Sequence, residues 1–99
     1  MLRMPAEWEP HERTWMAWPC AAYALGDKAR MAAQSWTAWA GVAQAVAMFE
    51  PVTLLVDPAV ESSVRTYLQV DAPHPITVLP LPLDDSWVRD TGPTFVIND

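Results

Sequence analysis

The chain has 99 residues, enough for one small domain, and its 52% apolar and 18% charged residues exclude a disordered polypeptide. A net charge of −6 argues against nucleic-acid binding, which needs a footprint of Lys and Arg, and suits a cationic small molecule. A single cysteine excludes an internal disulfide or a cysteine-based metal site, and the polar start carries no secretory signal or membrane span. We therefore expect a cytoplasmic protein that needs no metal or cofactor and contacts no membrane.

The first half of the chain predicts a strand and a long helix. Thr14–Trp18 is short, apolar and aromatic, which indicates a buried strand that Pro19 ends. From about Asp27, the expected N-cap, to Phe49 no proline occurs, and Glu50-Pro51 ends the helix. The predicted apolar face has residues at spacings of three and four, with two more beside it: Trp36, Trp39, Ala43 and Val46, then Val42 and Phe49.

The second half predicts three more strands and a second helix. Val52–Val56 is a continuous apolar run, typical of a strand covered on both faces. Asp57-Pro58 supplies a capping acceptor and a proline for a helix start. The stripe of that helix and the later strands are Val60, Val64, Tyr67 and Leu68, then Ile76–Leu79 and Thr94–Ile97. Asn98-Asp99 resembles the opening of a hairpin turn whose second strand is missing, so we expect an unpaired final strand.

This order of elements indicates an α/β fold with at least one parallel crossover. The expected ligand site is the loop from Asp84 to Phe95, which follows a predicted strand. A carboxylate can bind two guanidinium N–H groups side by side, and an aromatic wall can hold the cation or its alkyl stem. Trp87 and Asp90 therefore have the chemistry to grip an arginine-like substrate. The alternative is a polar turn capped by Asp84, with Arg89 paired to a carboxylate and Trp87 in the core.

The remaining reactive side chains predict less. Cys20 could act as a nucleophile only beside a base or a positive field, for which His11 and Arg13 are nearest in sequence. The favoured interpretation is a small buried residue after a strand. His11 with Glu12 is too sparse for a metal site, and His74, between two prolines, is expected in a solvated loop.

Two blocks of sequence carry a resemblance to a known family. The opening Met4-Pro5-Ala6-Glu7-Trp8-Glu9-Pro10-His11-Glu12-Arg13-Thr14-Trp15-Met16-Ala17-Trp18-Pro19 closely resembles the start of agmatine deiminases, relatives of the bacterial type of peptidyl-arginine deiminase. Phe49–Val56 and the Asp-Asp-Ser-Trp-Val-Arg-Asp-Thr-Gly-Pro-Thr-Phe loop also match, in the expected order. The likeness runs along nearly the whole chain.

The resemblance implies a fivefold pseudosymmetric α/β propeller (pentein), of which residues 1–99 would form the N-terminal part, about one and a half ββαβ-like units, truncated after a strand. It implies a hydrolase that converts agmatine to N-carbamoylputrescine and ammonia in putrescine biosynthesis, with a small guanidinium substrate. A homo-oligomer stays open for the full-length enzyme. Asp90 matches a catalytic acid that holds the guanidinium, and Trp87 matches a pocket-lining tryptophan.

The resemblance also implies what the chain lacks. The family's cysteine nucleophile, its central histidine and its second acid have no match here, and Cys20 does not match the nucleophile. The 99 residues alone are therefore expected to be inactive. Two alternatives stay open: a deiminase of peptidyl-arginine or free arginine, and a non-catalytic binding or assembly module on the same scaffold.

Overall fold

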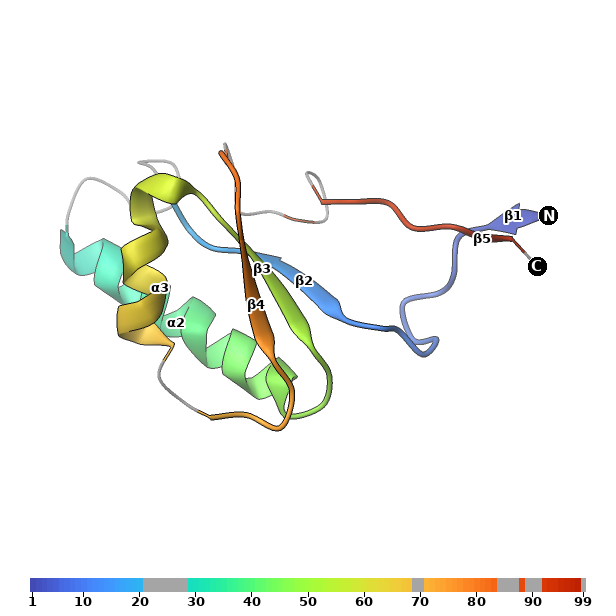
Figure 1. Cartoon of the computed structure of the whole chain (residues 1–99), viewed down its shortest axis with the longest axis horizontal. Helices are drawn as coiled ribbons and strands as arrows, with labels where there is room; N and C mark the ends of the chain where they lie inside the picture. Colours follow the sequence, from blue (N-terminus) through green and yellow to red (C-terminus); the bar gives the residue numbers. More distant parts are fainter. Residues whose placement is uncertain (21–28, 69–70, 84–87, 89–91, 99) are drawn as a thin grey trace.

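A three-stranded parallel sheet forms the centre of the molecule. The computed structural model describes residues 1–20, 29–68, 71–83, 88 and 92–98, and for residues 29–31 it describes the backbone only. The strands β2 (Thr14–Ala17), β3 (Val52–Val56) and β4 (Ile76–Pro80) lie in the order β2-β3-β4 (Figure 1). Both pairings are parallel, so each connection has to cross back over the sheet. The predicted α/β class with a parallel crossover is confirmed, and the three strands lie where the sequence places them.

Two helical segments make these crossovers and cover one face of the sheet (Figure 1). Helix α2 (Ala29–Ala47) joins β2 to β3, and the 3-10 turn η1 (Pro58–Val60) with α3 (Glu61–Tyr67) joins β3 to β4. Helix α2 ends two residues before the predicted Phe49, in a turn where the Phe49 N–H donates to the Val46 carbonyl at 2.9 Å. Phe49 is 82% exposed and Val42 is 54% exposed, so the predicted place of both beside the apolar face is wrong. Asp27, the predicted N-cap, lies outside the described residues.

Strand β3 is buried along its whole length because it lies between two strands and under two helices. Val52, Leu54 and Val56 point toward the helices and join Ala43 and Val64 in the core. Thr53 and Leu55 alternate to the opposite face and are also buried. The prediction that this run is covered on both faces is confirmed.

Aromatic side chains tie the helices to the end of β2. Trp18 is fully buried and its indole stacks on that of Trp36, with ring centroids 6.5 Å apart. The Trp18 Nε1–H donates to the Ser63 hydroxyl at 2.8 Å, and that hydroxyl donates to the Val60 carbonyl at 2.6 Å. The buried side-chain polar atoms in these two consecutive hydrogen bonds therefore all have a partner. The tryptophan-rich face of α2 is a core face, as its spacing predicts.

The two ends of the chain pair with each other in an arm that projects from this body (Figure 1). Strand β1 (Leu2–Arg3) is antiparallel to β5 (Ile97–Asn98). The Met1 ammonium also donates to the Asn98 side-chain oxygen at 3.1 Å. The predicted strand Thr94–Ile97 is thus wrong in its bounds, since 94–96 are not strand. The expected missing partner is also wrong, because the N-terminal residues supply it.

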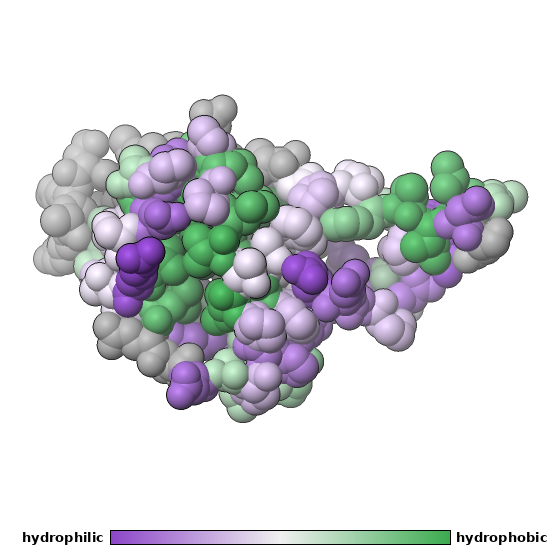
Figure 2. Space-filling model, in the orientation of Figure 1, coloured by the Kyte–Doolittle hydropathy of each residue, from purple (hydrophilic) through white to green (hydrophobic). Residues whose placement is uncertain are grey.

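Apolar side chains are exposed along this arm. Figure 2 shows hydrophobic residues gathered at its tip, away from the helices. Leu2 is 66% exposed, and Phe95 and Val96 are each 54% exposed. Phe95 is held on one side by Trp15, with ring centroids 6.0 Å apart. In the described part of the chain, helix length and hydropathy nowhere reach what crossing a membrane requires.

The hydrogen bond between Trp18 and Ser63 generates a prediction about stability. Ser63→Ala leaves a fully buried indole N–H without an acceptor, and an unsatisfied buried donor costs about 1–3 kcal/mol. We expect the free energy of unfolding to fall by that amount, measured by urea denaturation followed by circular dichroism.

Ser62→Ala is the matched control, since the adjacent hydroxyl is on the exposed side of the same helix. Its free energy of unfolding should stay within about 0.5 kcal/mol of wild type. Equal losses for Ser62→Ala and Ser63→Ala would show that the buried hydrogen bond to Trp18 does not set the cost, since alanine has the higher helix propensity at both positions.

Candidate functional site

Asp57 lies where the three parallel strands end, the edge at which α/β folds place ligand sites. Its Oδ1 accepts the Ala59 N–H at 2.9 Å and so caps η1, as the sequence predicts. Its Oδ2 accepts the Leu83 N–H at 3.1 Å, and the Cys20 thiol also donates to this carboxylate. One side chain therefore joins the residues that follow β2, β3 and β4.

These donors lower the pKa of Asp57 below its ordinary value of 3.8. The backbone N–H of Ala59 is the largest cause, Leu83 follows, and burial opposes both. A carboxyl group with a lowered pKa stabilises the fold at pH above its unfolded value, and this contribution is lost as the pH falls through the folded value. Asp57 is therefore ionised in the folded protein at neutral pH.

The loop that follows Leu83 carries the predicted substrate-binding residues. Trp87 and Asp90 lie outside the described residues, as do Asp84 and Arg89, so their roles stay predictions. The flanking positions are described: Leu83 is held by Asp57, and the Gly92 N–H donates to the Val88 carbonyl at 2.7 Å. Leu83 therefore links the chain before this segment to the end of β3, while the hydrogen bond between Gly92 and Val88 lies within the loop itself.

Gly92 is required at its position by a close approach of the backbone. A Cβ built on Gly92 would lie 2.5 Å from the Val88 carbonyl oxygen, a separation that real Cβ atoms essentially never show. The same oxygen accepts the Gly92 N–H, so moving it away would break that hydrogen bond. The glycine of the Asp-Thr-Gly-Pro sequence is therefore a structural requirement of this loop.

A hollow of about 640 Å³ lies between the N-terminal segment and the chain that leaves this loop. Val88 and Phe95 line it from the loop side, and Trp15 from β2. Charged side chains of both signs and one imidazole complete the wall: Glu7, Glu12 and Arg13, with His11. An aromatic surface next to carboxylates can hold a cation with an alkyl stem. The hollow therefore joins the two sequence blocks that carry the predicted function.

Side-chain contacts hold the N-terminal wall of this hollow on the sheet. The His11 imidazole contacts the Glu50 carboxylate at 2.6 Å, and the Thr14 hydroxyl donates to the same Glu50 oxygen. The Arg13 guanidinium donates to the Thr53 hydroxyl at 3.0 Å. His11 therefore pairs with a carboxylate as a structural contact, and the described residues contain no group of His, Cys, Asp or Glu arranged to hold a metal ion.

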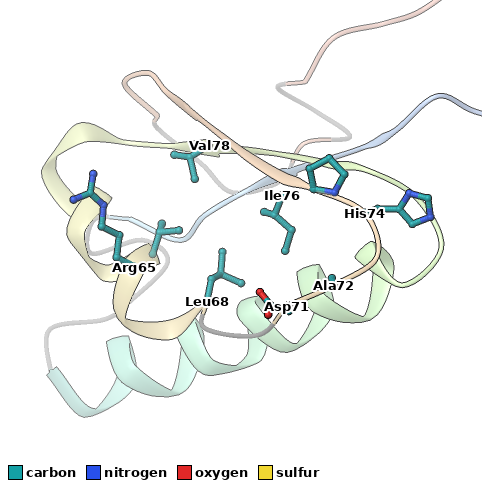
Figure 3. Close-up of a pocket in the computed structure, with 9 residues that line it drawn as sticks. Arg65, Leu68, Asp71, Ala72, His74, Ile76 and Val78 are labelled. Carbon is teal, nitrogen blue, oxygen red and sulfur yellow. The ribbon is translucent and has the colours of Figure 1, made fainter.

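A second hollow, of about 360 Å³, lies on the other side of the sheet under α3 (Figure 3). Figure 3 shows Leu68, Ile76 and Val78 around it, with Arg65 at one end and His74 at the other. It includes no residue of the two sequence blocks that indicate guanidinium chemistry. We therefore assign the candidate site to the hollow beside the loop and not to this one. His74 is half-buried and its backbone N–H donates to the Ala47 carbonyl, so its predicted place in a solvated loop is only partly right.

Cys20 is in a poor setting for a nucleophile. Its side chain is 6% exposed and its thiol donates to the Asp57 carboxylate. A neighbouring negative charge disfavours a thiolate, which is the reactive form. The interpretation of Cys20 as a small buried residue after a strand is confirmed. His11 and Arg13 are its nearest possible activators in sequence. Among the described residues, His11 instead contacts Glu50 and Arg13 donates to Thr53.

Two polar residues of this region were not predicted in their full roles. Glu50 was interpreted only as part of a helix stop, and Asp57 only as a cap. The contacts that they make to Thr14 and Leu83 span 36 and 26 residues. A local pattern carries no signal for such pairings.

Comparisons with known proteins agree on one family. The model of Porphyromonas-type peptidyl-arginine deiminase matches residues 3–99. A protein of Legionella pneumophila (strain Philadelphia 1) is 51% identical over 97% of the chain and 26% of its own length. The agmatine deiminase of Pseudomonas aeruginosa (strain LESB58) is 48% identical over 99% of the chain and 25% of its own length.

A solved structure is similar as well. The structure described as agmatine deiminase of Enterococcus faecalis catalyzing its reaction superposes with a TM-score of 0.78 and 36% identity. The match covers 98% of the chain and 25% of that structure. The chain therefore spans about a quarter of the length of the relatives that it matches.

Gly92 generates a prediction about the loop. Gly92→Ala places a methyl group against the Val88 carbonyl, and overpacking of this kind costs about 1–3 kcal/mol. We expect the local opening free energy at residue 92 to fall by that amount, measured by amide hydrogen exchange.

Gly41→Ala is the control, since, apart from its chain neighbours and the backbone of its own helix, no atom lies within 4 Å of a Cβ built at this exposed position of α2. It should leave exchange at residue 92 unchanged and stabilise the chain by up to about 1 kcal/mol. Unchanged exchange at residue 92 in Gly92→Ala would contradict the close approach.

Proposed function

Because the chain belongs to the Porphyromonas-type peptidyl-arginine deiminase family, we propose that it is the N-terminal part of a hydrolase that converts agmatine to N-carbamoylputrescine and ammonia. The observation that carries this proposal is the 48% identity to the agmatine deiminase of Pseudomonas aeruginosa over 99% of the chain. The structural match to the Enterococcus faecalis enzyme supports it, because it covers both sequence blocks in one superposition. In this proposal the enzyme needs no cofactor and works in the cytoplasm, in putrescine biosynthesis.

The proposed site combines one acid and one aromatic side chain. Asp90 binds the guanidinium through paired charge-assisted hydrogen bonds, and Trp87 forms a wall of the pocket. The acidic net charge favours the approach of a cationic substrate. The hollow between the loop and the N-terminal segment gives the pocket a place next to Val88.

The proposed architecture of the whole enzyme is a fivefold α/β propeller. The parallel β2-β3-β4 sheet with helices on one face fits one such unit and the beginning of another. Residues 1–99 are then one portion of a catalytic domain, with the nucleophile and the histidine supplied by chain outside these residues.

The function is tested by ammonia release. The 99-residue chain should release no ammonia from agmatine above background, because its one cysteine is buried beside a carboxylate. Catalytic groups act together, so the loss of one of them can cost nearly as much rate as the loss of all. A protein that contains the chain together with the remaining length of its relatives should release ammonia from agmatine in preference to arginine or peptidyl-arginine.

Each outcome of this assay has a meaning. Preference for arginine or a peptide would replace agmatine as the substrate within the family. Activity of the 99 residues that is lost in Cys20→Ala would overturn the exclusion of Cys20. If the complete protein has no activity on any guanidinium compound, the remaining interpretation is a non-catalytic binding or assembly module.

Asp90 generates a separate prediction in the complete protein. Asp90→Asn keeps the shape of the side chain but turns one acceptor oxygen into a donor amide that faces guanidinium donors. Losing such a contact costs about 2–5 kcal/mol, so kcat/KM for agmatine should fall about 30-fold or more.

Asp84→Asn is the control within the same loop, and its kcat/KM should fall much less if Asp84 only shapes the turn. Steady-state kinetics of both variants decide the matter. Near-normal kinetics of Asp90→Asn would remove this residue from the site.

A further inference from the structure

Asp57 uses both carboxylate oxygens, on two different segments of the chain. Oδ1 accepts the Ala59 N–H at 2.9 Å, two residues away, and Oδ2 accepts the Leu83 N–H at 3.1 Å, 26 residues away. Capping a helical turn needs one acceptor oxygen, which Ser or Asn supplies equally well. The second oxygen is therefore not explained by the cap, and its partner lies at the beginning of the loop that carries the proposed site.

The chain that leaves β4 is held to β3 at two successive points. The Leu81 N–H donates to the Val56 carbonyl at 2.9 Å, and the Leu83 N–H then donates to Asp57. Leu83 is the last described residue before the segment with Trp87 and Asp90. Because Asp57 is fixed by the end of the buried strand β3, the point at which the loop begins is fixed relative to the core.

We propose that Asp57 is a positioning residue for the guanidinium site, acting through the Leu83 N–H on the start of the loop that carries Trp87 and Asp90. The inference rests on the proposed function for what the loop binds. Its reason is geometric: paired hydrogen bonds to a planar guanidinium need an acid placed to within about 0.5 Å, and such placement comes from supporting hydrogen bonds to rigid elements. Asp57 supplies such a support from the sheet.

The hydrogen bond is tested first in the 99-residue chain. Asp57→Ser keeps an acceptor for the Ala59 N–H but is too short to reach Leu83. We expect the Leu83 amide to exchange at least about tenfold faster, the effect of losing one hydrogen bond to a charged group, with little change at Ala59. Cys20→Ala is the control, because it removes the thiol contact to the same carboxylate but keeps the carboxylate itself, and it should leave Leu83 unchanged.

Substrate binding is tested in the complete agmatine-hydrolysing protein. If Asp57 places the groups that bind the guanidinium, KM for agmatine rises about tenfold or more in Asp57→Ser and stays near wild type in Cys20→Ala. A merely structural role would reduce the amount of folded enzyme, which lowers the apparent kcat and leaves KM unchanged. Asp57→Thr is the second variant if Asp57→Ser does not fold, since threonine also caps helical turns and is also too short to reach Leu83.

The outcomes separate this inference from the proposed function. Unchanged exchange at Leu83 overturns the tether, and unchanged KM in a folded variant overturns the positioning role. A wild-type protein that does not hydrolyse agmatine would instead refute the proposed function and with it the role of the tether in substrate binding.

Discussion

The burial of β3 on both faces is the constraint on which the rest of the fold depends. Five successive residues, Val52–Val56, are removed from water, so every backbone group of the strand must find a partner within the sheet. Parallel strands on both sides supply those partners. Parallel neighbours in turn require crossovers, and α2 and α3 serve both as connections and as the cover of the inner face. The start of the loop with the predicted site residues follows from the same arrangement, because β4 ends at the edge where Asp57 binds Leu83.

The body of the fold could be predicted because its signals are local. The strands around Met16, Leu54 and Val78 are short apolar runs bounded by proline or a charged residue, and α2 shows spacings of three and four. The arm could not be predicted, because Leu2 and Asn98 pair across almost the whole chain and each strand has two residues. Thr94–Ile97 has the composition of a strand, but only Ile97 joins the ladder. Composition therefore overestimated the strand, and no local signal indicated its partner.

The sequence predicts which chemistry the candidate site could perform, but it does not predict the hydrogen bonds that hold the loop in place. The residue types around Trp87 are those that bind a guanidinium, yet the same residues fit a polar turn, and only the resemblance of two blocks favoured one interpretation. The family match over residues 3–99 now shows the family, while the placement of Trp87 and Asp90 stays a prediction. Asp57 could be predicted as a cap from Asp57-Pro58, but the use of its second oxygen depends on where β4 ends.

The acidic residues of this edge differ in what their charge can do. Asp57 already accepts hydrogen bonds from Ala59, Leu83 and Cys20, and these lower its pKa, so its negative charge is used inside the fold. Such a carboxylate holds its neighbours firmly because it remains ionised, and it has little capacity left for a ligand. A loop acid that binds substrate would also have to be charged, but its hydrogen-bond partner would be the substrate and not the protein. If Asp90 binds the substrate as proposed, its carboxylate is kept for a ligand while that of Asp57 is satisfied by the backbone, and the order of the strands places Asp57 where the loop with Asp90 begins.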